Sequence, residues 1–208
     1  METAMVGGSF DPIHRGHLHL IHTVASRSPY RRFILVPVSQ NHFKPDADPA
    51  PGSDRVAMAN LAVEAYPEIY PDDPKLEFVV DDCELHREGP SYTYDTVREL
   101  YLKYPVKGRL GLLLGDDLLA QLKKWHRYKE LKELVRFIVI RREGATVEFD
   151  DIAADLFYLD NPTVDESSTI IRTALKRLNA DEPLDPAVER LMTANVASYV
   201  RTHRLYRA

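Results

Sequence analysis

The sequence predicts an α/β fold in which helices cover both faces of a doubly wound parallel sheet. Short continuous apolar runs alternate along the chain with stretches of helical periodicity. Runs without polar alternation are typical of strands that are buried on both faces. A glycine-rich segment follows the first run directly, where a parallel sheet of this kind binds ligands.

The first strand is expected to end at Ala4-Met5-Val6, and Leu18, Ile21 and Ala25 then form an apolar helical stripe. Further strands are expected at 33–38, 76–80, 110–114 and 137–140, with another at 156–159. Helical patterns lie between them at roughly 17–27, 53–65, 93–104 and 117–134. This βαβ alternation predicts a Rossmann-like sheet.

The last fifty residues look helical. The hydroxyls at 167–169 provide an N-cap for a helix at 169–178, and Asp185-Pro186 has the pattern of a second helix start. The sequence contains no internal repeat. We therefore expect one domain over 1–208, with a parallel α/β core at about 1–150 and a C-terminal helical subregion at about 151–208.

Composition excludes several classes of protein. A net charge of −5 argues against broad nucleic-acid binding, which needs a basic surface. No run approaches the ~20 apolar residues of a membrane span, and no signal region precedes the first strand. The single cysteine, Cys83, fits a reducing compartment. We expect a cytoplasmic protein without nucleic-acid or membrane partners, and a homo-oligomer is left open.

The segment from Gly7 to Leu18 predicts a phosphate site. Gly7 and Gly8 allow a backbone bend and a close approach that a Cβ would block. Gly16 lets a phosphate oxygen approach the helix N-terminus, whose free N–H groups favour anions. His14 and His17 can each donate a hydrogen bond to a phosphate oxygen, more strongly when protonated. Zinc is disfavoured because no cysteine or carboxylate stands at ligand spacing, and an ordinary turn with capping histidines is the alternative.

The same run resembles the G-G-x-F-D-x-x-H-x-G-H signature of the nucleotidyltransferase superfamily, which includes nicotinate-, nicotinamide-, pantetheine-phosphate and glycerol-phosphate nucleotidyltransferases. Three later segments are similar to motifs of the bacterial nicotinate-nucleotide adenylyltransferases. They are Ser91-Tyr92-Thr93, Gly115-Asp116-Asp117 followed by Trp125, and 167–172 with the sequence S-S-T-I-I-R. All four occur in the family's order.

The resemblance implies adenylyl transfer from ATP to nicotinate mononucleotide, assisted by Mg²⁺. No carboxylate cluster in the sequence suggests metal ligands in the protein, which agrees with Mg²⁺ arriving on ATP. His14 and His17 would be catalytic. Mononucleotide binding would fall to Tyr92, Thr93 and Trp125. The residues implied in ATP binding are Gly7, Gly8, Ser9, Phe10, Gly16, Lys44, Gly115, Asp117, Ser167, Ser168 and Arg172.

Several alternatives stay open at this point. Arg172 could be solvated, Asp117 could compensate a helix N-terminus, Trp125 could be a core residue, and Ser91 and Thr93 could cap a helix. Phe43 stands where relatives have a histidine before the basic residue, with His42 one position early, and His126 follows the tryptophan. The acceptor could instead be nicotinamide mononucleotide or phosphopantetheine, although Tyr92 and Trp125 disfavour the latter. A nucleotide-binding module without turnover is the remaining alternative.

Overall fold

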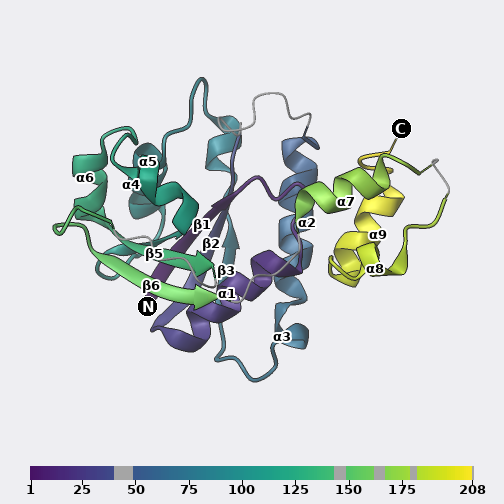
Figure 1. Cartoon of the computed structure of the whole chain (residues 1–208), viewed down its shortest axis with the longest axis horizontal. Coiled ribbons are helices and arrows are strands. Elements are labelled where there is room, and N and C mark those ends of the chain that lie inside the picture. Colours follow the sequence, from purple (N-terminus) through teal and green to yellow (C-terminus); the bar gives the residue numbers. More distant parts are fainter. Residues whose placement is uncertain (40–48, 143–148, 162–166, 179–181, 208) are drawn as a thin grey trace.

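The computed structural model describes residues 1–39, 49–142, 149–161, 167–178 and 182–207 of the chain. Its strands form one sheet in the order β3-β2-β1-β4-β5-β6, and all neighbouring strands are parallel (Figure 1). The predicted doubly wound parallel fold is therefore confirmed. The strands are β1 (Glu2–Gly8), β2 (Tyr30–Pro37), β3 (Glu77–Val80), β4 (Leu110–Gly115), β5 (Val135–Arg142) and β6 (Leu156–Asn161).

Helices connect the strands and follow the sheet. The α-helices are α1 (Arg15–Arg27), α2 (Gly52–Glu64), α3 (Tyr66–Ile69), α4 (Thr93–Lys103), α5 (Leu119–Leu122), α6 (Tyr128–Leu134), α7 (Ser168–Leu175), α8 (Pro186–Glu189) and α9 (Ala194–Thr202). Two short 3₁₀ helices, η1 (Cys83–His86) and η2 (Asp116–Leu118), follow β3 and β4. Among the described residues, no helix is long and apolar enough to cross a membrane.

Two hydrophobic cores bury the two faces of the sheet. Residues of α1, α2, α7 and α9 line the first core, and residues of α4, α5 and α6 line the second. In β1, Ala4 and Val6 enter the first core while Met5 enters the second, because successive strand residues point to opposite faces. Figure 1 shows α4, α5 and α6 on one side of the sheet, with α2 and the C-terminal helices on the other. Both cores explain why the strand sequences lack polar alternation.

The helical pattern at 117–134 is not one helix, contrary to the expectation from its periodicity. It is divided into η2, α5 and α6, and Arg127 before α6 has a left-handed backbone with φ of 52°. The Arg127 guanidinium carbon lies 4.3 Å from the centroid of the Tyr94 ring. Neither glycine nor proline marks this break, so periodicity alone runs through it.

The C-terminal part begins as expected and differs in length. Ser167 caps α7 and Asp185 caps α8, but α7 ends at Leu175 rather than at 178. β6 pairs with β5 from Leu156 to Asn161, so the sheet extends past position 150 and the helices that follow it begin with α7.

Candidate active site

The site lies where the order of the sheet reverses. β1 is flanked by β2 on one side and by β4 on the other, although β2 and β3 precede β4 in the chain. In doubly wound sheets, ligands bind beyond the carboxyl ends of the strands at this reversal. Those ends are Gly8 of β1 and Gly115 of β4.

The turn after β1 is shaped by Phe10. Its backbone has φ of 46°, and its side chain is fully buried. The ring lies over Gly8, where an added Cβ would be 2.9 Å from Phe10 Cε1. At Gly7 an added Cβ would meet only Met5 Cε at 3.7 Å, an ordinary contact. Phe10 therefore belongs to the core, and only its backbone is available to a ligand.

The two histidines stand together at the start of α1. His14 is the N-cap residue, and the centroids of the two imidazole rings are 3.9 Å apart. The backbone N–H of His14 donates to Nδ1 of His17 at 3.2 Å. Since that nitrogen accepts a hydrogen bond, the proton of a neutral His17 ring is on Nε2. His17 thus has one N–H left to donate.

Burial keeps both imidazoles neutral. It lowers the pKa of His14 from 6.5 to about 4. The pKa of His17 is lowered well below 6.5, first by burial and then by the charge of His14. The stronger donation expected from protonated rings therefore does not apply to the free protein at neutral pH. Nδ1 of His14 is buried and makes no hydrogen bond within the described residues.

The N-terminus of α7 packs against the turn after β1. Ser167 accepts a hydrogen bond from the backbone of Ile170 at 3.2 Å, as predicted for an N-cap. Ser168 does not cap this helix, because its Oγ donates to the carbonyl oxygen of Pro12 at 3.0 Å. The first and last of the four motifs are therefore in contact.

Arg172 completes this contact. Its Nη1 donates to the carbonyl oxygen of Asp11 at 2.5 Å, and its side chain is only 19% exposed. The alternative of a solvated arginine is thus wrong. The predicted contact of Arg172 with phosphates stays a prediction.

Two buried charged residues hold the turn and had no role in the sequence analysis. Asp11 is 3% exposed and accepts hydrogen bonds from the Ala50 backbone and the Tyr206 hydroxyl. Arg55 of α2, also 3% exposed, donates from Nη1 to the carbonyl oxygens of Ser9 and Val38. Asp11 is a fixed position of the first motif, so the sequence could have indicated that it has a role in the site. The sequence around Tyr206 contains no such indication.

Gly115 and Asp117 stand at the end of β4. Gly115 is the N-cap residue of η2, and a Cβ there would clash with Oδ1 of Asp117. Asp117 is exposed in the first turn of η2, where its negative charge can interact favourably with the positive end of the helix dipole, as the alternative assumes. Its contact with a ribose stays a prediction.

A second cluster joins the two middle motifs. Tyr92 is the N-cap residue of α4 and 41% exposed, and its ring stacks on His126 with centroids 4.3 Å apart. Trp125 is half-buried and packs against the second core. The alternative that Ser91 or Thr93 caps α4 is wrong, because no side chain caps this helix.

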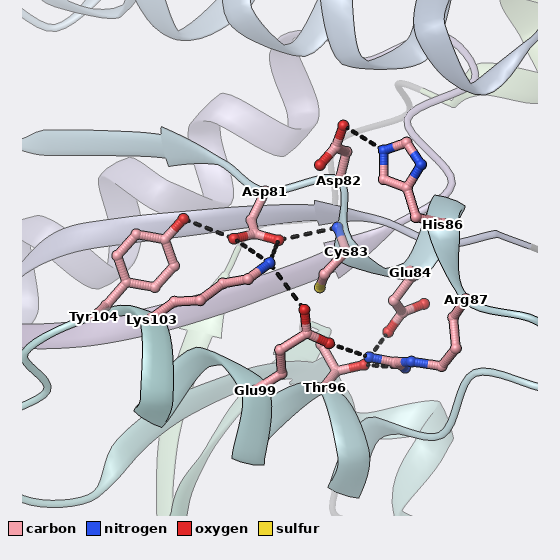
Figure 2. A network of polar contacts seen from close by, with 10 residues as sticks. All are labelled: Asp81, Asp82, Cys83, Glu84, His86, Arg87, Thr96, Glu99, Lys103 and Tyr104. Atoms are coloured by element: carbon pink, nitrogen blue, oxygen red, sulfur yellow. Dashed lines mark hydrogen bonds and ion pairs between the residues drawn. The ribbon is translucent and has the colours of Figure 1, made fainter.

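A network of polar side chains supports the segment that leads to Tyr92 (Figure 2). The Thr96 hydroxyl in α4 is fully buried, and it donates to Glu84 at 2.7 Å and accepts from Arg87 at 2.9 Å. Arg87 also donates to Glu99 at 2.8 Å. These bonds join η1 to α4 on both sides of residues 88–92.

The other end of the network fixes Asp81 at the end of β3 (Figure 2). Burial alone would raise the pKa of Asp81, but hydrogen bonds from Tyr104, Cys83 and Lys103 lower it below the usual range. Burial and the contact with Asp81 raise the pKa of the Cys83 thiol to about 12. Cys83 is therefore a protonated structural residue rather than a nucleophile.

Lys44 and His42 lie outside the described residues. Within the part of the chain that the structure describes, no three His, Cys, Asp or Glu side chains are grouped so that they could hold a metal ion. The two histidines themselves are N–H donors that suit phosphate oxygens.

Comparisons with known proteins agree with this geometry. The cytidylyltransferase-like family model matches residues 5–174. A probable nicotinate-nucleotide adenylyltransferase of Dehalococcoides mccartyi is 35% identical and covers 99% of this chain and 97% of its own length. The nicotinate-nucleotide adenylyltransferase of Bacillus subtilis is 34% identical, and the match covers 96% of this chain and 95% of that protein. The Plasmodium falciparum nicotinic acid mononucleotide adenylyltransferase complexed with NaAD has the same fold, with a TM-score of 0.72 at 19% identity. The match covers 99% of this chain and 97% of that chain. The chain therefore belongs to the nicotinate-nucleotide adenylyltransferases, within the cytidylyltransferase-like family.

Proposed function

We propose that this protein transfers the adenylyl group of ATP to nicotinate mononucleotide, which forms nicotinic acid adenine dinucleotide and pyrophosphate in NAD biosynthesis. The relatives named above support the reaction. The observation in this chain that carries it is the buried, neutral pair of His14 and His17 at the N-terminus of α1, where the sheet order reverses.

The reaction is an in-line displacement at the α-phosphorus of ATP. An oxygen of the mononucleotide 5′-phosphate forms a bond to this phosphorus, while the bond to the bridging oxygen of the β-phosphate breaks. Pyrophosphate leaves with the electron pair of that bond. The attacking phosphate is already ionised at neutral pH, so positioning and charge stabilisation are the protein's main tasks.

His14 and His17 would stabilise the charge that develops on the α-phosphate. The Nε2 proton of His17 and an N–H of His14 are fixed donors, and the free N–H groups at the start of α1 add to them. Gly7, Gly8 and Gly16 line this turn and present backbone without side chains. Fixed donors in a buried site need little rearrangement when the transition state forms.

The leaving pyrophosphate would be bound by Arg172, with Lys44 as a second cation and with Mg²⁺ arriving on ATP as part of the substrate. Arg172 lies beside the turn that holds the histidines, which supports this role. Gly115 and Asp117 would contact the ribose of ATP. The pyridine ring would lie near Tyr92, Thr93 and Trp125. Tyr92 is exposed and Trp125 is half-buried, so both rings are accessible for stacking.

Isotope transfer tests the reaction itself. The purified protein is incubated with nicotinate mononucleotide and ATP labelled either at the α-phosphate or at the γ-phosphate. The proposal predicts that the α-label appears in the dinucleotide and the γ-label in pyrophosphate. Release of γ-labelled orthophosphate without a labelled dinucleotide would overturn it.

A further inference from the structure

The carboxylate of Asp11 gathers contacts from three distant parts of the chain. Oδ1 accepts from the backbone N–H of Ala50 at 2.9 Å and from the hydroxyl of Tyr206 at 2.8 Å. Oδ2 lies 3.4 Å from Nη1 of Arg172. A carboxylate that is 3% exposed needs such partners, because its charge is otherwise costly to bury.

Arg172 is held at one end of its guanidinium. Nη1 donates to the carbonyl oxygen of Asp11 at 2.5 Å and also faces the Asp11 carboxylate. Nη2 lies 3.5 Å from the hydroxyl of Thr169, one turn earlier in α7. Because the guanidinium is a rigid plane attached to the side chain at Nε, the two contacts of Nη1 restrict the directions in which its other N–H groups point.

Tyr206 reaches Asp11 from the end of the chain. The two residues are 195 positions apart, and the Tyr206 backbone has φ of 63°. Burial first, and then the Asp11 charge, raises the pKa of Tyr206 far above its usual range. The hydroxyl is therefore a proton donor at every physiological pH. Its bond to Oδ1 orients the carboxylate so that Oδ2 faces Arg172.

We propose that Asp11 and Tyr206 are positioning residues, which together hold the Arg172 guanidinium in the orientation that binds the triphosphate of ATP. The proposal rests on the proposed function in one respect, because it takes Arg172 as a ligand of the β- and γ-phosphates. A held arginine loses less rotamer freedom on binding than a mobile one, so its orientation contributes to affinity. The last residues of the chain thereby tune ATP binding.

The test compares two tyrosines that attach the C-terminal part. Tyr206→Phe removes only the hydroxyl that reaches Asp11. Tyr199→Phe is the matched control, because the Tyr199 hydroxyl donates to Asp54 of α2 at 2.8 Å instead of to the turn after β1. Calorimetry measures the dissociation constants of ATP and of AMP, which lacks the β- and γ-phosphates.

The proposal predicts that Tyr206→Phe weakens ATP binding roughly three- to tenfold while AMP binding is unchanged. This is less than the full contribution of a hydrogen bond to a charged acceptor, because Tyr206 acts on ATP only through Asp11 and Arg172. Tyr199→Phe should leave the ratio of the two constants as in the wild type. Equal losses for ATP and AMP, or equal effects of the two variants, would show that the Asp11–Tyr206 bond only attaches the C-terminus.

Two further measurements keep the outcomes separate. Asp11→Asn removes the charge beside Arg172 and should reduce the preference for ATP over AMP at least as much as Tyr206→Phe. A wild type that binds ATP no better than AMP would overturn the positioning proposal whatever its turnover. A wild type that fails to adenylate nicotinate mononucleotide, yet shows the Tyr206-dependent preference, would overturn the proposed function alone.

Discussion

His14 and His17 form a donor pair whose state is set by burial. Both rings are neutral, and the bond from the His14 backbone to His17 Nδ1 selects the tautomer of His17. A neutral donor costs less to bury than an imidazolium, and it can still stabilise charge that develops only during the reaction. The pair is therefore suited to the transition state more than to initial binding.

Two substitutions of His17 separate catalysis from helix capping. His17→Asn retains an acceptor near the His14 backbone but loses the Nε2–H donor, whereas His17→Ala loses both. If the donor is catalytic, both variants should lower kcat by ~10²–10³ with a much smaller change in the KM for ATP. Steady-state kinetics checks this. Near-normal kcat in His17→Asn would make His17 a capping residue.

The lowered pKa of His14 also predicts how stability depends on pH. Between pH 6.5 and 4 the unfolded chain protonates this residue while the folded protein does not, so the free energy of unfolding falls as the pH falls. For this shift the loss is on the order of 3 kcal/mol. Urea unfolding should show that the free energy of unfolding depends less steeply on pH in His14→Asn than in the wild type. Parallel curves would contradict the assignment.

At the scale of elements, the turn between β1 and α1 depends on two glycines for different reasons. Gly8→Ala places a methyl group against the buried Phe10 ring and should destabilise the protein by about 1–3 kcal/mol. Gly7→Ala meets only an ordinary contact, so its stability should stay close to that of the wild type. It should nevertheless raise the KM for ATP, because the backbone of Gly7 is proposed to approach a phosphate. Denaturant unfolding and ATP titration of both variants check this, and equal stability losses would refute the distinction.

The network between η1 and α4 supports the segment before Tyr92, which is proposed to bind the pyridine nucleotide. Thr96→Val removes the hydroxyl that connects Glu84 with Arg87, which should cost about 1–3 kcal/mol of stability. It should also raise the KM for nicotinate mononucleotide more than that for ATP, because the segment before Tyr92 loses its support. Thr96→Ser retains the hydroxyl and should behave as the wild type. A uniform change in both KM values would argue for a general loss of packing.

The order of the strands and helices could be predicted from the sequence, but the points at which a helical stretch is interrupted could not. The apolar runs correctly indicated the strands because each is buried between two cores. The division of 117–134 could not be predicted, since no glycine or proline marks it and the side chain of the left-handed Arg127 contacts Tyr94, which is distant in the sequence, as well as Glu130. Similarly, the bond of Ser168 to Pro12 depends on the docking of α7, which its own sequence does not reveal.

At the scale of the whole molecule, the order of the strands brings motifs that are distant in the sequence together at the carboxyl ends of the strands. β1 and β4 are neighbours, so the first motif and the Gly115 segment end beside each other. The four motifs could be found in the sequence because each combines glycines, hydroxyls or aromatics in a fixed order. The supporting contacts of Arg55 and Tyr206 could not be predicted, because they join residues that are 46 and 195 positions apart.

The choice of mononucleotide tests the central claim most directly. The measurement is a coupled assay that compares kcat/KM for nicotinate and nicotinamide mononucleotides with saturating ATP. The family resemblance implies that backbone N–H groups of this protein bind the pyridine carboxylate. A hydrogen bond to a charged acceptor contributes roughly 1.5–3 kcal/mol, and an amide in place of the carboxylate would leave these N–H groups mispaired. The account predicts at least a tenfold preference for nicotinate mononucleotide, which corresponds to ~1.4 kcal/mol. Comparable values for the two substrates would contradict it.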